Sequence, residues 1–276
     1  RFETTCDTEV ILYGYMEYGM EVAKQLNGIF AFAIWDAKRN ALFLCRDRLG
    51  VKPLFYAIKG DTLVFGSEPK ALFAHPQIQT QADLDSFREI FGLGPARTPG
   101  CGVFHGLREV KPGCILEYSP EKTKEFPYWS LEAKPHTDNY AQTVETVSWL
   151  LRDAVKRQLV SDVPVCSFLS GGIDSSVVTA IASQQLQSKG LTLNTFRFDF
   201  THNETSLQAN AFQPTRVRPY VVQVLALYPL HHTYLECDEA TLADMLKDAV
   251  RMKDLPGMTD VDASLLYFCG LVKQHN

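Results

Sequence analysis

The sequence has 276 residues and a mass of 31.0 kDa, enough for about two domains of ordinary size. Hydrophobic residues make up 46% and charged residues 21%, which excludes a wholly disordered chain. The net charge is −5 without a run of basic residues, so we expect neither a nucleic-acid partner nor binding to an anionic membrane. No stretch reaches the roughly 20 apolar residues that span a bilayer. The scattered cysteines, without a Cys-x-x-Cys pair, indicate free thiols in a cytoplasmic protein.

The first half of the sequence predicts a helix followed by antiparallel strands. The expected elements are a helix at residues 7–18 and two hairpins, with strands at 29–35, 41–45, 54–58 and 62–65. Asp7 is placed to cap the helix. Residues 29–35 are apolar at odd and at even positions alike, so both faces of that strand should be covered. A second sheet and helices would cover them, which predicts an α+β domain built on antiparallel sheets.

The middle of the sequence, between residues 91 and 135, is rich in glycine and proline, which indicates irregular structure with short strands such as 114–118. Two polar stretches, 119–123 and 132–139, are the best candidates for a linker. We expect the domain boundary at the second of them, which gives domains of residues 1–135 and 136–276.

The second half changes to an alternation of helices and strands. Helices are expected at 139–160, 175–189, 217–227, 239–250 and 262–273, and strands at 163–169, 193–198 and 231–235. Strands that alternate with helices form a parallel sheet with right-handed crossovers. The second domain is therefore predicted to be α/β, and incomplete, because the sequence stops where another strand is due.

The strongest chemical signal is the run Leu169-Ser170-Gly171-Gly172-Ile173-Asp174-Ser175-Ser176, between an expected strand and an expected helix. Backbone N–H groups and the positive end of a helix dipole meet there, which suits an anion. The two glycines let the backbone approach phosphate oxygens, and the serines add hydroxyl donors. Asp174 would repel phosphate, so its useful role is to hold a Mg²⁺ ion. The alternative is a strand-to-helix turn whose glycines only permit tight packing.

This run resembles the pyrophosphate-binding loop, Ser-Gly-Gly-x-Asp-Ser, of the ATP pyrophosphatase group, which adenylates a carboxylate or carbonyl and releases pyrophosphate. The resemblance implies an ATP site with Mg²⁺ at Asp174, formed by Leu169, Ser170, Gly171, Gly172, Asp174, Ser175 and Phe198. Leu169 would contact the nucleotide through its backbone. Phe198 stands after the next strand, where the family usually presents an aliphatic residue to adenine.

The first half of the sequence indicates which enzyme family of the ATP pyrophosphatase group the chain resembles. Residues 45–56, Cys-Arg-Asp-Arg-Leu-Gly-Val-Lys-Pro-Leu-Phe-Tyr, resemble a signature of class II glutamine amidotransferases, and residues 27–36 and 65–72 match the flanking strands. With the loop, this order resembles glutamine-hydrolysing asparagine synthetase over almost the whole chain. The resemblance implies an Ntn-hydrolase-like αββα glutaminase domain ahead of an adenine-nucleotide-binding α/β domain. Asp7 matches the acidic residue that receives the glutamine α-amino group, a role compatible with a helix cap.

Several parts of the family pattern are missing from the sequence. The family's nucleophile is an N-terminal cysteine, whereas residue 1 is Arg1, and Cys6 is no substitute. The arginine and the Asn-Gly segment that bind glutamine would lie upstream, and the second nucleotide motif would lie beyond Asn276. We therefore expect a piece of a longer polypeptide that has no catalytic residue for glutamine hydrolysis, no glutaminase activity of its own and only weak binding of ATP.

Other polar pairs are expected to have structural roles. Arg46 and Asp47 should form an internal ion pair that fixes a strand end, rather than a catalytic dyad. His231 and His232 lie at a strand edge without the neighbours that a metal site needs. Glu68 and Lys70 are expected at a domain interface or in solvent. Arg216 and Arg218 are expected at a solvated helix start.

The resemblance implies that the intact protein makes asparagine from aspartate, glutamine and ATP through a β-aspartyl-AMP intermediate. Its partners would be these small molecules, and a homodimer stays open. Two alternatives remain. One is a relative, such as a β-lactam synthetase, that adenylates another carboxylate. The other is a homologue that keeps the fold as a scaffold without chemistry, against which the intact loop argues.

Overall fold

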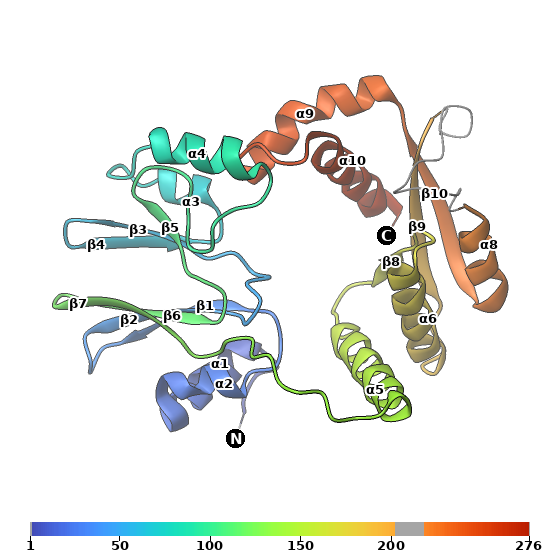
Figure 1. The fold of residues 1–276 in the computed structure, drawn as a ribbon, viewed down its shortest axis with the longest axis horizontal. Coiled ribbons are helices and arrows are strands. Elements are labelled where there is room, and N and C mark those ends of the chain that lie inside the picture. Colours follow the sequence, from blue (N-terminus) through green and yellow to red (C-terminus); the bar gives the residue numbers. More distant parts are fainter. Residues whose placement is uncertain (1, 202–217, 276) are drawn as a thin grey trace. The chain divides into compact units, whose positions relative to one another are not determined.

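A computed structural model gives the structure of the chain and describes residues 2–201 and 218–275 (Figure 1). Arg216 lies outside these residues. The contacts divide the chain into two compact units, one of Arg1–Lys134 with Lys253–Gly257 and the other of Pro135–Met252 with Met258–Asn276. No helix in the described ranges is both long and apolar enough to cross a bilayer.

The first unit contains two antiparallel sheets, with the strand orders β1-β2-β6-β7 and β4-β3-β5. The strands are β1 (Ala31–Asp36), β2 (Ala41–Arg46), β3 (Phe55–Lys59), β4 (Thr62–Gly66), β5 (Leu107–Glu109), β6 (Cys114–Ser119) and β7 (Lys122–Pro127). The helices are α1 (Asp7–Tyr18), α2 (Val22–Gln25), α3 (Pro69–Phe73) and α4 (Leu84–Leu93), with the short η1 (Gly19–Glu21) between the first two. The predicted first helix and both predicted hairpins are confirmed.

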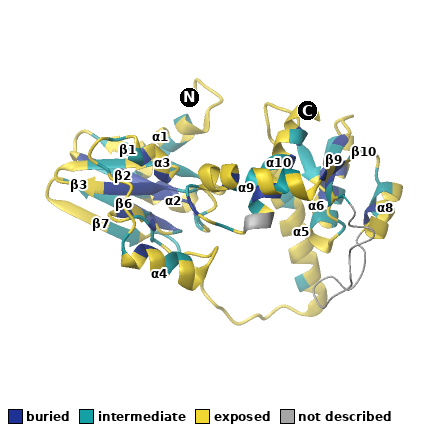
Figure 2. Cartoon of the chain, turned by 90° about the horizontal axis from the view of Figure 1, so that it is seen from above, coloured by how far each residue is buried: buried dark blue, intermediate teal, exposed yellow. Residues whose placement is uncertain are grey.

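The described part of this unit is layered, because each sheet packs one face on the other sheet and its opposite face on helices. Leu44 and Tyr56 lie in the core between the sheets. Phe43 packs on the other side of β2, in a core that includes Ala23 of α2. Leu72 of α3 is buried against the three-stranded sheet. Figure 2 shows β2 in dark blue, since most of its residues are buried whichever face they point to.

Some expectations for this unit are wrong. β1 is not covered on both faces, since Trp35 is 58% exposed at the edge strand of its sheet. Residues 119–123 are not a linker, because Ser119 pairs with Lys122 where β6 turns into β7. The region after residue 106 is more regular than expected. Gly106 and Gly113 adopt φ values of 74° and 65° just before β5 and β6, so glycines there start strands rather than ending regular structure.

The second unit contains a parallel sheet with the strand order β10-β9-β8. Its strands are β8 (Cys166–Phe168), β9 (Leu193–Phe200) and β10 (Leu230–Cys237). Its helices are α5 (Tyr140–Gln158), α6 (Ile173–Gln187), α8 (Arg218–Leu227), α9 (Glu239–Lys253) and α10 (Thr259–His275). The predicted alternation of helices and parallel strands is confirmed, although β8 is shorter than the strand expected at 163–169.

The two faces of this sheet differ in chemistry, because successive side chains of a strand point to opposite faces. Phe196 and Phe198 of β9 belong to an apolar core with Phe268 of α10. Thr195 and Arg197, which alternate with these two residues along β9, are also buried, and the Thr195 hydroxyl lies 2.8 Å from Nδ1 of His232 on β10. One face of the sheet is therefore aromatic and the other carries buried polar groups.

Candidate functional site

The glycine-rich loop joins the end of β8 to the start of α6. Leu169 is fully buried, and its N–H donates to the carbonyl of Phe196 on β9 at 2.9 Å, so the loop starts from the edge of the sheet. Gly171 has a φ of 91°, a conformation that other residues rarely adopt. Gly172 is the N-cap of α6, with extended backbone and an exposed position. The sequence thus produces a sharp strand-to-helix turn whose glycines lie at its tip.

Several backbone donors of this loop have no acceptor. The Gly172 carbonyl accepts from the N–H of Ser176 at 3.1 Å, which is the first turn of the helix. The N–H groups of Gly171, Ile173 and Asp174 find no acceptor in the described part of the chain. The first N–H groups of a helix carry partial positive charge from its dipole. An anion at this helix start would satisfy several donors at once.

The side chains of the loop complete the donor set. The hydroxyl groups of Ser170 and Ser175 lie 2.9 Å apart, and the hydroxyls of Ser175 and Ser176 donate to the Gly172 carbonyl at 3.1 and 2.7 Å. Asp174 is exposed in the first turn of α6, and no described residue bonds to its carboxylate. The loop therefore offers hydroxyl and amide donors beside an accessible carboxylate.

Arg197 is a buried charge beneath the loop that the sequence analysis missed. Its side chain is 7% exposed, and Nη1 donates to the Ser170 carbonyl at 2.6 Å. Nη2 lies 3.5 Å from the carboxylate of Asp199, and Nε has no partner. The signal in the sequence is a charged residue between two aromatic residues of a buried strand. Such a position is costly to fill with a charge unless the charge has a partner.

Asp7 begins α1 but is not its cap. The N-cap is Cys6, without a side-chain cap bond, and Glu9 instead accepts from the N–H groups of Glu3 and Thr4 at 2.8 and 2.7 Å. The carboxylate of Asp7 is exposed, and among the described residues it accepts a hydrogen bond from the Cys6 thiol, with sulfur and oxygen 3.6 Å apart. Because Glu9 satisfies the nearby donors, the Asp7 carboxylate is available to a cation.

The expected ion pair between Arg46 and Asp47 is wrong. Arg46 pairs with Glu109 at 2.9 Å, whereas Asp47 accepts from the N–H groups of Val51 and Lys52, both at 2.9 Å. Adjacent strand residues point to opposite faces, so their side chains cannot readily meet. Both groups still fix the turn after β2, which is the structural role that the sequence analysis gave them.

Phe198 is placed in the aromatic core of the second unit. Its ring stacks on Phe268 with centroids 4.2 Å apart and meets Phe168, at the end of β8, edge to face at 4.8 Å. Phe198 is only partly buried. The structure thus brings it next to the strand that leads into the loop.

The remaining predicted pairs make contacts that include no residue of the glycine-rich loop. His232 bonds to Thr195, and burial, followed by the charge of Arg197, lowers its pKa. Lys70 pairs with Glu68 at 3.0 Å and with Asp254 at 3.3 Å, within the first unit. The described residues contain no group of three or more potential metal ligands, whether at these histidines or elsewhere. Arg218 lies over the ring of Tyr234 at 5.1 Å.

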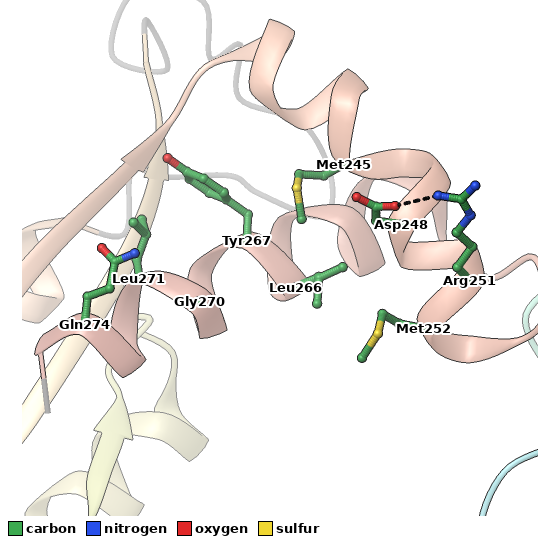
Figure 3. A pocket seen from close by; sticks show the side chains of 9 residues that line it. All are labelled: Met245, Asp248, Arg251, Met252, Leu266, Tyr267, Gly270, Leu271 and Gln274. Carbon is green, nitrogen blue, oxygen red and sulfur yellow. Dashed lines mark hydrogen bonds and ion pairs between the residues drawn. The ribbon is translucent and has the colours of Figure 1, made fainter. Parts of the chain in front are cut away.

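A pocket of about 470 Å³ lies between α9 and α10 (Figure 3). Met245, Leu266 and Tyr267 contribute apolar surface, and Asp248 and Arg251 pair with each other at 3.3 Å. The charged groups of the pocket thus already neutralise one another. It contains no residue of the glycine-rich loop, and neither does a second hollow between α5 and α6.

Two family models match the chain. Residues 1–129 match the glutamine amidotransferase domain family, and residues 146–276 match the asparagine synthase family. The chain is 48% identical to asparagine synthetase (glutamine-hydrolyzing) 3 of Bacillus subtilis, over 99% of the chain and 45% of that protein. It is 37% identical to asparagine synthetase (glutamine-hydrolyzing) 2 of the same organism, over 67% of the chain and 26% of that protein.

More distant matches include amidase chyE of Penicillium rubens, 30% identical over 93% of the chain and 38% of that protein. A solved structure, the glutamine phosphoribosylpyrophosphate amidotransferase of B. subtilis with ADP and GMP, is 15% identical in sequence. The match covers 86% of this chain and 56% of the amidotransferase chain. Its TM-score of 0.32 is too low to support an argument. The chain spans less than half the length of these curated relatives. It belongs to the asparagine synthetase family, with a glutamine amidotransferase domain in its first half and an asparagine synthase domain in its second.

Proposed function

We propose that the protein that carries this chain is an ATP-dependent cytoplasmic ligase that hydrolyses glutamine and uses the ammonia to convert aspartate to asparagine. Residues 1–135 belong to the glutaminase domain, with the αββα layering of Ntn hydrolases, and residues 136–276 to the ATP-pyrophosphatase domain. The family supports the overall reaction. The observation that carries the nucleotide part is the start of α6, where N–H groups without an acceptor lie beside an accessible carboxylate.

The loop would bind the pyrophosphate part of ATP. The N–H groups of Gly171, Ile173 and Asp174 can each donate to a phosphate oxygen, since none is used within the described chain. The hydroxyls of Ser170 and Ser175, which bond to each other in this structure, could rotate to donate as well. These donors would hold the phosphate charge of ATP before the reaction and the same charge on the pyrophosphate as it leaves.

Asp174 fits a divalent cation, because its carboxylate is exposed and unpaired among the described residues. Carboxylate oxygens are ligands that Mg²⁺ prefers in proteins, usually together with phosphate oxygens of the substrate. Bound Mg²⁺ would neutralise the charge of the pyrophosphate. The part of Asp174 is to hold that ion at the helix start, where its own negative charge is also favourable.

The adenine side of ATP would lie along the ends of β8 and β9. The N–H of Leu169 is already bonded to the Phe196 carbonyl, so Leu169 would contact the nucleotide through its own backbone carbonyl. Phe198, which is only partly buried, would contact adenine with its ring, held in place by Phe168 and Phe268. An aromatic ring fixed by packing presents a rigid apolar surface, which suits a planar base.

In the first unit, Asp7 would pair with the α-amino group of glutamine. Its carboxylate is exposed and faces no competing cation among the described residues. A bond between a carboxylate and an ammonium group is stronger than a neutral hydrogen bond and selects for a free amino acid. This role does not require that Asp7 cap the helix.

The proposed reaction has two steps, in which pyrophosphate and then AMP are the leaving groups. An oxygen of the aspartate β-carboxylate attacks the α-phosphorus of ATP, the bond to the β-phosphate breaks, and pyrophosphate leaves to the loop. Ammonia then attacks the β-aspartyl-AMP carbonyl, and AMP departs with the oxygen. Adenylation is needed because an unactivated carboxylate oxygen is a poor leaving group.

Exchange of labelled pyrophosphate into ATP tests this proposal on the protein that carries the chain. Exchange should occur and should depend on aspartate, because the adenylation step is reversible. Asp174→Asn should lower the exchange rate by about 100-fold or more, the size of loss seen when a preorganised electrostatic group is removed. The matched control is Asp138→Asn, at an exposed carboxylate ahead of α5, and it should leave the rate unchanged.

The two alternatives predict different results in the same assay. Exchange that requires another carboxylate, and not aspartate, would identify a relative of the β-lactam synthetase type. No exchange with any carboxylate would contradict the ligase and favour a scaffold without chemistry.

A further inference from the structure

We propose that Arg197 is a positioning residue for the glycine-rich loop, which holds the Ser170 carbonyl beneath the loop so that the Gly171 N–H points to the bound phosphate. The inference deepens the proposed function, since it concerns the same site. Arg197 would not touch the nucleotide. It would act through the backbone of the loop.

The contacts of Arg197 indicate this role. A buried guanidinium needs partners, and the shortest bond it makes is from Nη1 to the Ser170 carbonyl, at 2.6 Å. The carboxylate of Asp199 lies at 3.5 Å, the outer limit of hydrogen-bond range, and Nε has no partner. The guanidinium therefore interacts mainly with one carbonyl of the loop rather than with a carboxylate.

Peptide geometry links this carbonyl to the phosphate site. In a planar trans peptide the C=O and the following N–H point in opposite directions. Because the Ser170 carbonyl is drawn toward Arg197 on β9, the Gly171 N–H must point away from that side chain. That N–H has no acceptor among the described residues. Gly171 accommodates the resulting φ of 91°, which other residues rarely adopt.

The opposite orientation of this peptide would harm anion binding. If the peptide rotated, the carbonyl oxygen of Ser170 would face the phosphate and repel it, and one N–H donor would be lost. A glycine-flanked peptide can rotate more easily than any other, because glycine populates both signs of φ. A fixed, charged donor beneath the loop removes that freedom before the ligand arrives, which lowers the cost of ordering the site.

Three substitutions at Arg197 distinguish the effect of the hydrogen bond to the Ser170 carbonyl from the effect of the positive charge. Arg197→Met keeps much of the length and removes both, Arg197→Gln keeps an N–H donor without charge, and Arg197→Lys keeps charge and a donor. We expect the KM for ATP to rise by about 10- to 100-fold in the methionine variant, the worth of a hydrogen bond from a charged group. The lysine variant should recover most of this loss and the glutamine variant part of it. The kcat should change less than KM, because the loop holds phosphate before and during the reaction.

The control is Leu193→Ala, which removes a buried side chain at the start of β9, at the other end of that strand from Phe198, and leaves the loop contacts in place. It should lower the melting temperature at least as much as Arg197→Met, while the KM for ATP stays at its parent value. If the two variants raise KM equally, or if lysine restores nothing, Arg197 has only a structural role and the inference is overturned.

The proposed function can fail separately. If the unsubstituted protein shows no exchange of pyrophosphate into ATP, the ligase proposal is wrong, and calorimetric binding of magnesium pyrophosphate then tests Arg197, because Arg197→Met should weaken that binding and equal binding would reject the role. If exchange is normal and the series leaves the KM for ATP unchanged, the ligase proposal stands and the role of Arg197 is rejected.

Discussion

Replacement of Arg46 by methionine should lower the free energy of unfolding of the first unit by about 3–5 kcal/mol, the cost of breaking a buried ion pair from one side. Arg46 is 6% exposed, and its guanidinium bonds to Glu109 at 2.9 Å. It also donates to three carbonyl oxygens at 2.8 Å each, those of Gly50, Lys52 and Val110. Methionine fills much of the space but leaves the Glu109 charge and the carbonyls without their donor. Since a domain is stable by about 5–15 kcal/mol, the loss is a large fraction of the total.

Urea unfolding, followed by hydrogen exchange of peptides from β2 and β3, measures this change in the first unit alone. The matched control is Arg39→Met, because Arg39 is 52% exposed where it pairs with Glu117 at 3.1 Å, and such surface pairs contribute about 0–1 kcal/mol. Addition of Glu109→Gln to the Arg46 variant should recover part of the loss, since it removes the unpaired charge. An Arg46 variant that unfolds at the same urea concentration as the Arg39 variant would refute the reasoning.

Three further predictions concern both units. In the longer protein that carries this chain, Asp7→Asn should raise the KM for glutamine by about 10- to 100-fold in a glutamate-release assay, whereas Glu17→Gln, on the same helix, should not. Burial, and secondarily a neighbouring arginine, lowers the pKa of His232, so below a pH of about 6.5 the unfolded chain binds more protons and stability falls. In urea titrations across this pH range, His232→Gln should lose that part of the dependence, and an unchanged slope would contradict it. Gly102→Ala should lower the melting temperature, because its Cβ would lie 2.5 Å from the Leu107 backbone.

Much of the fold could be predicted because local patterns decided it. The helix at 7–18 has no competing strand pattern, and the hairpin of β3 and β4 turns at Gly60, between two runs of strand-forming residues. The glycine-rich loop was found because glycine, serine and aspartate at this spacing have few other uses between a strand and a helix. Each of these signals lies within a short stretch of sequence.

The features that the sequence did not reveal depend on contacts between distant residues. Nothing near Arg197 in the sequence shows that its partner is Ser170, 27 positions earlier. Arg46 likewise finds Glu109 rather than the adjacent carboxylate, because the pairing of β3 with β5 brings that side chain within reach. Trp35 sits in an apolar run but is exposed, since strand order places β1 at an edge. Tertiary neighbours, not local composition, decided all three.

The turn after β2 has a consequence for how its sequence can diverge. Asp47 holds the turn by accepting N–H groups of the backbone, so the side chains in between do little of the work. Leu49 and Val51 are 72% and 56% exposed. Gly50, in contrast, has a φ of 66°, and a Cβ there would lie 2.7 Å from Pro112. We therefore expect substitutions at 49 and 51 to leave the path of the main chain unchanged, and substitutions at 47 and 50 to disturb it.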